Sequence, residues 1–122
     1  MSPEDFLRTS YTLMIRKLNK IKNIDDQKVR GKLPLPLLKE QGELASSLLE
    51  GIRQMINLID YEADVAREVA DLLNEVGRLL GLSMVLKDPE ALDSALRLLR
   101  EAVGRPTSIL GNLEQELDFQ KT

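Results

Sequence analysis

The sequence predicts an all-α fold, an antiparallel bundle of four to five helices that forms a single domain over residues 1–122. Apolar residues recur at alternating spacings of three and four, which places them along one side of a helix. No segment shows the period-two alternation of a half-buried strand. The composition agrees, because it is rich in Leu, Ile, Val and Ala but holds only two Tyr, two Phe and no Trp, whereas strands are enriched in aromatic residues.

The first helix is expected to begin at Ser2-Pro3, with Ser2 as the capping residue and two acidic residues in the first turn. Gly31 ends it at the latest, and residues 25–36 form a basic, proline-containing connection. Within this connection we expect Lys32 to Leu37 to be an extended strap, because each proline disfavours a helical conformation at the preceding residue. The apolar stripe of the helix consists of Leu7, Tyr11, Met14, Leu18 and Ile21.

A second helix is expected from Leu37, and it ends at a turn near residues 60–62. Gly51 lies in the middle of its stripe, although a helical glycine costs about 1 kcal/mol relative to alanine. Close packing of another helix against Gly51 would explain a glycine at this position. The stripe consists of Ala45, Leu48, Ile52, Met55 and Ile59.

The last part of the chain is predicted to form a helical hairpin over residues 61–103, divided at Lys87-Asp88-Pro89-Glu90. Asp88 can cap the following helix, and Pro89 suits its first position. Short connections of this kind join helices that fold back on each other. Residues 104–106 stop the helix, a weaker amphipathic segment runs from Thr107 to Leu117, and residues 118–122 are expected to fray.

Residue chemistry argues against an enzyme. The chain has no Cys and no His, so the commonest ligands of zinc and haem and the commonest general base are missing. Asp25-Asp26 are neighbours on a polar face and do not converge on a pocket. Gly77 and Gly81 lack the strand and the lysine of a phosphate-binding loop. We therefore expect no catalytic residue, no metal site and no cofactor.

The net charge of −3 is unevenly distributed. Residues 1–40 hold nine Lys or Arg against five acids, whereas residues 41–122 hold eight against fifteen. The basic segment from Arg16 to Lys32 is either a site for a nucleic acid or an acidic partner, or a solvated helix face and loop, and the absence of interleaved aromatic residues favours the second interpretation. No apolar run of the roughly 18 residues needed to span a membrane is present, and the acidic N-terminus lacks the apolar core of a signal peptide. A cytoplasmic protein is expected.

Several short motifs resemble a known family. Val85-Leu-Lys-Asp-Pro-Glu-Ala-Leu92 and the helices on either side of it resemble the C-terminal half of FliS-type flagellin export chaperones. Ser2-Pro-Glu-Asp-Phe-Leu7 and Leu13-Met14 are similar to the N-terminal signatures of that family, so about half of the chain is covered. The chain departs from the family at Ile15-Arg16-Lys17 and in the strap from Leu33 to Leu37.

The resemblance implies a non-enzymatic chaperone or adaptor. It would bind a disordered segment of flagellin or of another secreted subunit in apolar grooves between helices, without a cofactor. Two alternatives stay open: a small nucleic-acid-binding protein that uses residues 16–32, and a homo-oligomeric structural protein such as a homodimer.

The predicted partner-binding face combines residues of the first two helices. Ile15 widens the first stripe beyond what one neighbouring helix needs, and methionine adapts to varied partners because its side chain is flexible. The other interpretation, that these residues are ordinary core, is equally consistent with the pattern. The predicted residues are Tyr11, Met14, Ile15, Leu18, Ile52, Met55, Ile56 and Ile59.

Overall fold

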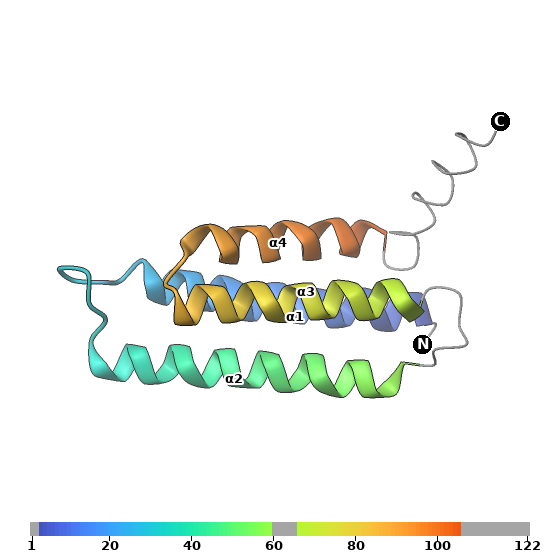
Figure 1. Cartoon of the computed structure of the whole chain (residues 1–122), viewed down its shortest axis with the longest axis horizontal. Coiled ribbons are helices and arrows are strands. Elements are labelled where there is room, and N and C mark those ends of the chain that lie inside the picture. Colours follow the sequence, from blue (N-terminus) through green and yellow to red (C-terminus); the bar gives the residue numbers. More distant parts are fainter. Residues whose placement is uncertain (1–2, 60–65, 106–122) are drawn as a thin grey trace.

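Four helices that lie side by side make up the computed structural model, which describes residues 3–59 and 66–105 (Figure 1). They are α1 (Pro3–Asp25), α2 (Leu35–Leu58), α3 (Ala66–Val85) and α4 (Pro89–Gly104). The expected all-helical architecture is therefore confirmed for the described residues, and four helices agree with the predicted number. The predicted cap at Ser2, the turn near residues 60–62 and the segment 107–122 lie outside them.

The helices surround one core in the order α1, α2, α3, α4. Helix α1 packs most extensively on α4 and next on α2, while α3 packs on α4 and, over the smallest of the four main interfaces, on α2. The connections between α1 and α2 and between α3 and α4 lie at the same end of the molecule (Figure 1). None of the described helices combines the length and the apolar character needed to cross a membrane.

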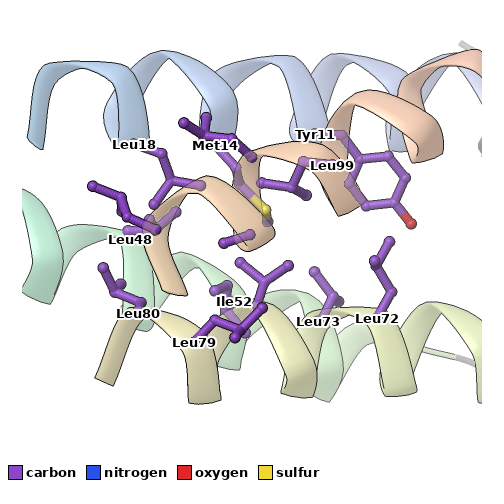
Figure 2. Packing of buried hydrophobic residues seen from close by; sticks show 14 of the residues in the cluster. Tyr11, Met14, Leu18, Leu48, Ile52, Leu72, Leu73, Leu79, Leu80 and Leu99 are labelled. Carbon is purple, nitrogen blue, oxygen red and sulfur yellow. The ribbon is translucent and has the colours of Figure 1, made fainter. Parts of the chain in front are cut away.

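The core forms where the apolar stripes of the four helices meet (Figure 2). Tyr11 and Leu18 of α1, Leu73 of α3 and Leu99 of α4 are completely buried. Alanines occupy three further buried positions of α4, namely residues 91, 95 and 102. Small side chains allow helix backbones to approach closely, and α4 takes part in the two most extensive interfaces, those with α1 and α3.

Helix α2 has the smallest fraction of buried residues among the four helices. It has four buried residues among 24, whereas α3 has eight among 20 and α4 has six among 16. One of the four is polar: Gln41 Nε2 donates to the carbonyl oxygen of Ile21 at 3.2 Å and to Asp25 Oδ1 at 3.3 Å. These bonds satisfy a buried amide and connect the start of α2 to the end of α1.

The proline-containing connection is shorter than expected, and the predicted strap is wrong for Leu35 and Pro36. Pro34 is extended, with φ −53° and ψ 145°, but α2 begins at Leu35 and includes Pro36 in its first turn. A proline is tolerated there because the first N–H groups of a helix have no intrahelical partner. The chain reverses before Pro34, where Val29 and Lys32 exchange backbone hydrogen bonds of 2.8 and 3.1 Å. Residues 30 and 31 of this tight turn both have positive φ, as a type I′ turn requires.

The start of α4 agrees with the sequence prediction. Asp88 Oδ1 accepts a hydrogen bond from the backbone N–H of Glu90 at 3.0 Å, and Pro89 is the first residue of the helix. We expect Asp88→Ala to lower the free energy of unfolding by about 1 kcal/mol, because the first turn of α4 loses its side-chain acceptor. Urea denaturation measures this loss. Asp88→Asn should retain most of the stability, and an unchanged Asp88→Ala variant would contradict the assigned cap.

Candidate partner-binding groove

An apolar groove runs along the outer side of the contact between α1 and α2. Its volume is about 260 Å³. Leucine, methionine and phenylalanine side chains form most of its surface, and Lys17 and Gln54 are its long polar members. The residues that line this α1–α2 groove are Phe6, Ser10, Leu13, Met14 and Lys17 of α1 and Leu48, Gly51, Gln54, Met55 and Leu58 of α2.

The groove exists because each helix carries a second stripe beside its core stripe. In α1, residues 6, 10, 13 and 17 follow spacings of four, three and four, which aligns them on the side that faces α2. The two small residues, Ser10 and Gly51, leave space between the helices. A Cβ atom built on Gly51 would meet no heavy atom within 4 Å. The expectation of close packing at Gly51 is therefore wrong, and this glycine opens the groove instead.

Three large apolar side chains of the groove are unusually exposed. Phe6 is 45% exposed, Leu13 51% and Leu58 77%. Single exposed leucines are common on protein surfaces, but several around one concave site indicate a binding surface. The polar residues at the rim are engaged elsewhere: Lys17 Nζ donates to Ser47 Oγ at 2.7 Å, and Gln54 Nε2 donates to Glu50 Oε1 at 3.4 Å.

Only two of the eight sequence-predicted site residues, Met14 and Met55, line the groove. Tyr11, Leu18 and Ile52 are buried in the core, where a partner cannot reach them in this conformation. Met14 is also mostly buried, so it forms the floor of the groove.

The three isoleucines of the prediction lie elsewhere. Arg8 and Lys22 of α1 both contact α4, at Val103 and Asp93 respectively. Ile15 is seven residues from each of them, and residues seven apart lie on the same side of a helix, so Ile15 lies on the α4 side of α1. Ile56 is seven residues from Leu49, whose Cδ2 lies 3.8 Å from the position of a Cβ on Gly77 of α3. It therefore lies on the α3 side of α2. Ile59 packs half-buried against the core.

Sequence reasoning missed the exposed part of the groove, namely Phe6, Leu13 and Leu58. The signal was the spacing of residues 6, 10, 13 and 17 along one flank of the core stripe. That spacing marks a helix face, but a sequence alone does not show which neighbouring helix a flank faces.

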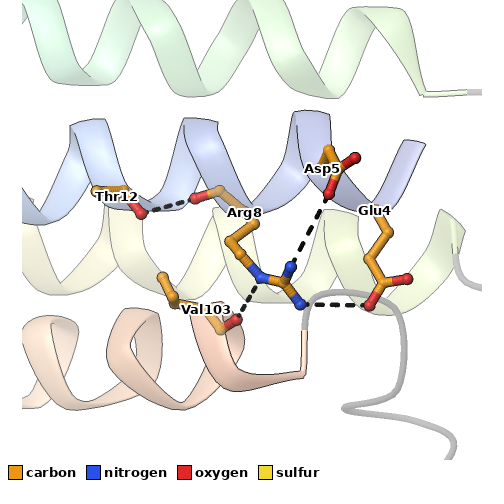
Figure 3. A network of polar contacts seen from close by, with 5 residues as sticks. All are labelled: Glu4, Asp5, Arg8, Thr12 and Val103. Atoms are coloured by element: carbon orange, nitrogen blue, oxygen red, sulfur yellow. Dashed lines mark hydrogen bonds and ion pairs between the residues drawn. The ribbon is translucent and has the colours of Figure 1, made fainter. Parts of the chain in front are cut away.

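Arg8 connects the beginning of α1 with the end of α4 (Figure 3). Its Nε donates to the carbonyl oxygen of Val103 at 3.2 Å, and its Nη2 lies 3.3 Å from Glu4 Oε1. A second guanidinium nitrogen lies 3.9 Å from Asp5 Oδ1. A cation is favourable at this position because the last carbonyl groups of a helix carry partial negative charge. The contact fixes the last turn of α4 beside the first turns of α1.

Tyr11 places a hydroxyl group in the apolar core. The side chain is completely buried, and its hydroxyl has no hydrogen-bond partner among residues 3–59 and 66–105. Burial disfavours the phenolate and raises the pKa of Tyr11 to about 12. The hydroxyl therefore stays protonated at neutral pH and acts as part of the core.

The basic segment 16–32 does not form one continuous free surface. Lys22 Nζ pairs with Asp93 Oδ1 at 2.7 Å, and Lys28 Nζ pairs with Asp25 Oδ1 at 2.9 Å. Arg16 and Lys20 are exposed on α1, and Arg30 and Lys32 lie at the tight turn. The segment is thus divided between the side of the bundle and its end.

The described part of the chain contains no group of three carboxylate, His or Cys residues that could hold a metal ion. Comparisons of the whole chain with protein-family models, with curated proteins and with solved structures gave no match. The resemblance to FliS-type chaperones therefore stays a prediction.

Proposed function

We propose that this protein is a non-enzymatic chaperone or adaptor that binds an amphipathic helix of a partner protein in the α1–α2 groove. The observation that carries the proposal is the cluster of exposed Phe6, Leu13 and Leu58 around an open groove of about 260 Å³. Covering such side chains removes apolar area from water, at roughly 25 cal/mol per Å².

The dimensions of the groove suit a short helix. From Phe6 to Lys17 it follows eleven residues of α1, or roughly 17 Å at a rise of 1.5 Å per residue. A partner helix of about three turns would fill it with apolar anchors spaced by three, four and seven residues. Lys17 at one end favours a partner with acidic residues at the corresponding position.

The resemblance of residues 85–92 to FliS-type chaperones supports a more specific version of this proposal. The partner would be a disordered segment of flagellin or of another secreted subunit, held in the cytoplasm before export by an antiparallel four-helix bundle. The two connections at one end of the molecule (Figure 1) support that arrangement of the helices. The segment would gain helical structure when it enters the groove, and its ordering entropy would lower the net affinity.

We expect Leu13→Glu to weaken partner binding at least tenfold, because it places a carboxylate on an apolar surface that the partner must cover. Binding is measured by the fluorescence anisotropy of a labelled peptide from the disordered terminal segment of flagellin. Val85→Glu is the matched control, since Val85 is 78% exposed and does not line the groove. Both variants should keep the helicity and melting temperature of the wild type.

Three results would contradict the proposal. The wild-type protein fails to bind the peptide, the two variants lose affinity equally, or the protein instead binds nucleic acid tightly with an affinity that falls steeply with salt. A mobility-shift assay at two salt concentrations tests the third result.

A further inference from the structure

The α1–α2 groove opens toward the end of the bundle where α4 stops. Phe6, at that end of the groove, is two residues before Arg8, and Arg8 Nε contacts the carbonyl oxygen of Val103 at 3.2 Å (Figure 3). Helix α4 ends at Gly104. The chain therefore leaves α4 close to the mouth of the groove, on the other side of α1.

The residues that follow Arg105 have the pattern of a groove-binding helix. They lie outside the described residues. Leu110, Leu113 and Leu117 follow spacings of three and four, and Ile109 lies beside them. This spacing gives a helix with one apolar side.

The lengths match. To reach the groove the chain has to cross α1, which takes about two of the 8–10 Å distances between packed helix axes. Residues 106–110, if extended, span roughly 17 Å at 3.3–3.6 Å per residue. Residues 111–118, if helical, extend roughly 12 Å. The groove from Phe6 to Lys17 extends roughly 17 Å along α1 by the same helical rise, so the segment fits within it.

The charges of the segment and of the groove favour the same orientation of the segment. A segment that enters beside Phe6 brings its second half to the Lys17 end of the groove. That half contains Glu114, Glu116 and Asp118, and the exposed Arg16 and Lys20 flank Lys17 on α1. Opposite charges at this end favour one orientation of the segment, with its last residues near Lys17.

We propose that residues 111–118 dock into the α1–α2 groove of their own chain, with Leu113 and Leu117 in the groove and the acidic residues beside Lys17. The docked segment would occupy the groove that we propose for a partner helix, so the segment and the partner would compete. The competition rests on the proposed function, whereas the docking itself does not. A tethered segment has an effective concentration in the millimolar range, so a partner has to displace it.

The test uses a fluorescent peptide of residues 106–122 and the full-length protein. In one variant, Leu113→Asp and Leu117→Asp together disable the chain's own segment. This variant is expected to bind the peptide at least tenfold more tightly than the wild-type protein, whose groove is already occupied. Adding Leu13→Glu to the disabled variant should abolish binding, while adding Val85→Glu should leave it unchanged.

Equal binding by the wild-type protein and the disabled variant, or no binding by the disabled variant, would overturn the proposal. A wild-type dimer in light scattering that becomes monomeric in the disabled variant would show that the segment enters a second copy instead. The flagellin peptide separates the two proposals. If it fails to bind while the 106–122 peptide binds as expected, docking stands and the proposed function falls. If it binds both proteins equally, the proposed function stands and the self-docking falls.

Discussion

Replacing Leu99 with alanine is expected to lower the free energy of unfolding by about 3–5 kcal/mol, in the upper part of the range for buried leucines. Leu99 is completely buried in the same core cluster as Tyr11 (Figure 2). The cost depends on how far the surroundings collapse into the space left behind. The buried positions 95 and 102 of α4 are already alanines, so the backbone of α4 has little room to move closer and most of the cavity would persist.

Urea denaturation followed by circular dichroism measures this loss. Leu35→Ala is the matched control, because Leu35 is 78% exposed at the start of α2, and exposed substitutions usually change stability by less than about 0.5 kcal/mol. Similar losses in the two variants would contradict the position of Leu99 in the core.

Raising the pH from 10 to 12 is expected to remove about 2 kcal/mol of stability through Tyr11 alone, because each state is only half titrated at its own pKa and the rest of the loss falls outside this window. Burial raises the pKa of this tyrosine from 10.0 to about 12, and each pKa unit corresponds to about 1.4 kcal/mol. Between these two values the folded protein keeps the tyrosine proton while the unfolded chain has lost it. Because the folded state then binds more protons, stability falls as the pH rises through this window.

The Tyr11→Phe variant isolates this effect from the titration of the lysines. It should lose less stability than the wild type between pH 10 and 12. At pH 7 it should be more stable by about 1 kcal/mol, because the buried hydroxyl has no hydrogen-bond partner among the described residues. Urea denaturation of both proteins at pH 7, 10 and 11.5 measures these differences. Parallel losses at high pH would show that Tyr11 titrates normally.

Local signals in the sequence were sufficient for most of the fold. Asp88 and Pro89 define the start of α4 because capping depends only on neighbouring residues, and the alternating spacings locate the core side of each helix. The strap prediction failed at Leu35 and Pro36, where the first turn of α2 needs no N–H donor from a proline. At Leu35, helix initiation outweighs the restriction that a proline places on the residue before it.

The candidate site was less predictable, because it depends on the arrangement of the helices. Leu13 and Ile15 flank the same core stripe of α1, one toward α2 and the other toward α4, and only the placement of those helices distinguishes an open flank from a covered one. Gly51 shows the same difficulty. A helical glycine indicates either a close neighbour or an open space, and the structure shows an open space.

The modest burial of α2 has a consequence for how the protein can respond to a bound helix. Helices α1, α3 and α4 share the larger interfaces, whereas α2 contributes four buried residues and has the smallest main interface, the one with α3. Detaching a segment costs least free energy where few buried contacts hold it. Helix α2 is therefore expected to detach at a lower free-energy cost than the other three helices, and its outward movement would widen the groove for a bulkier helix.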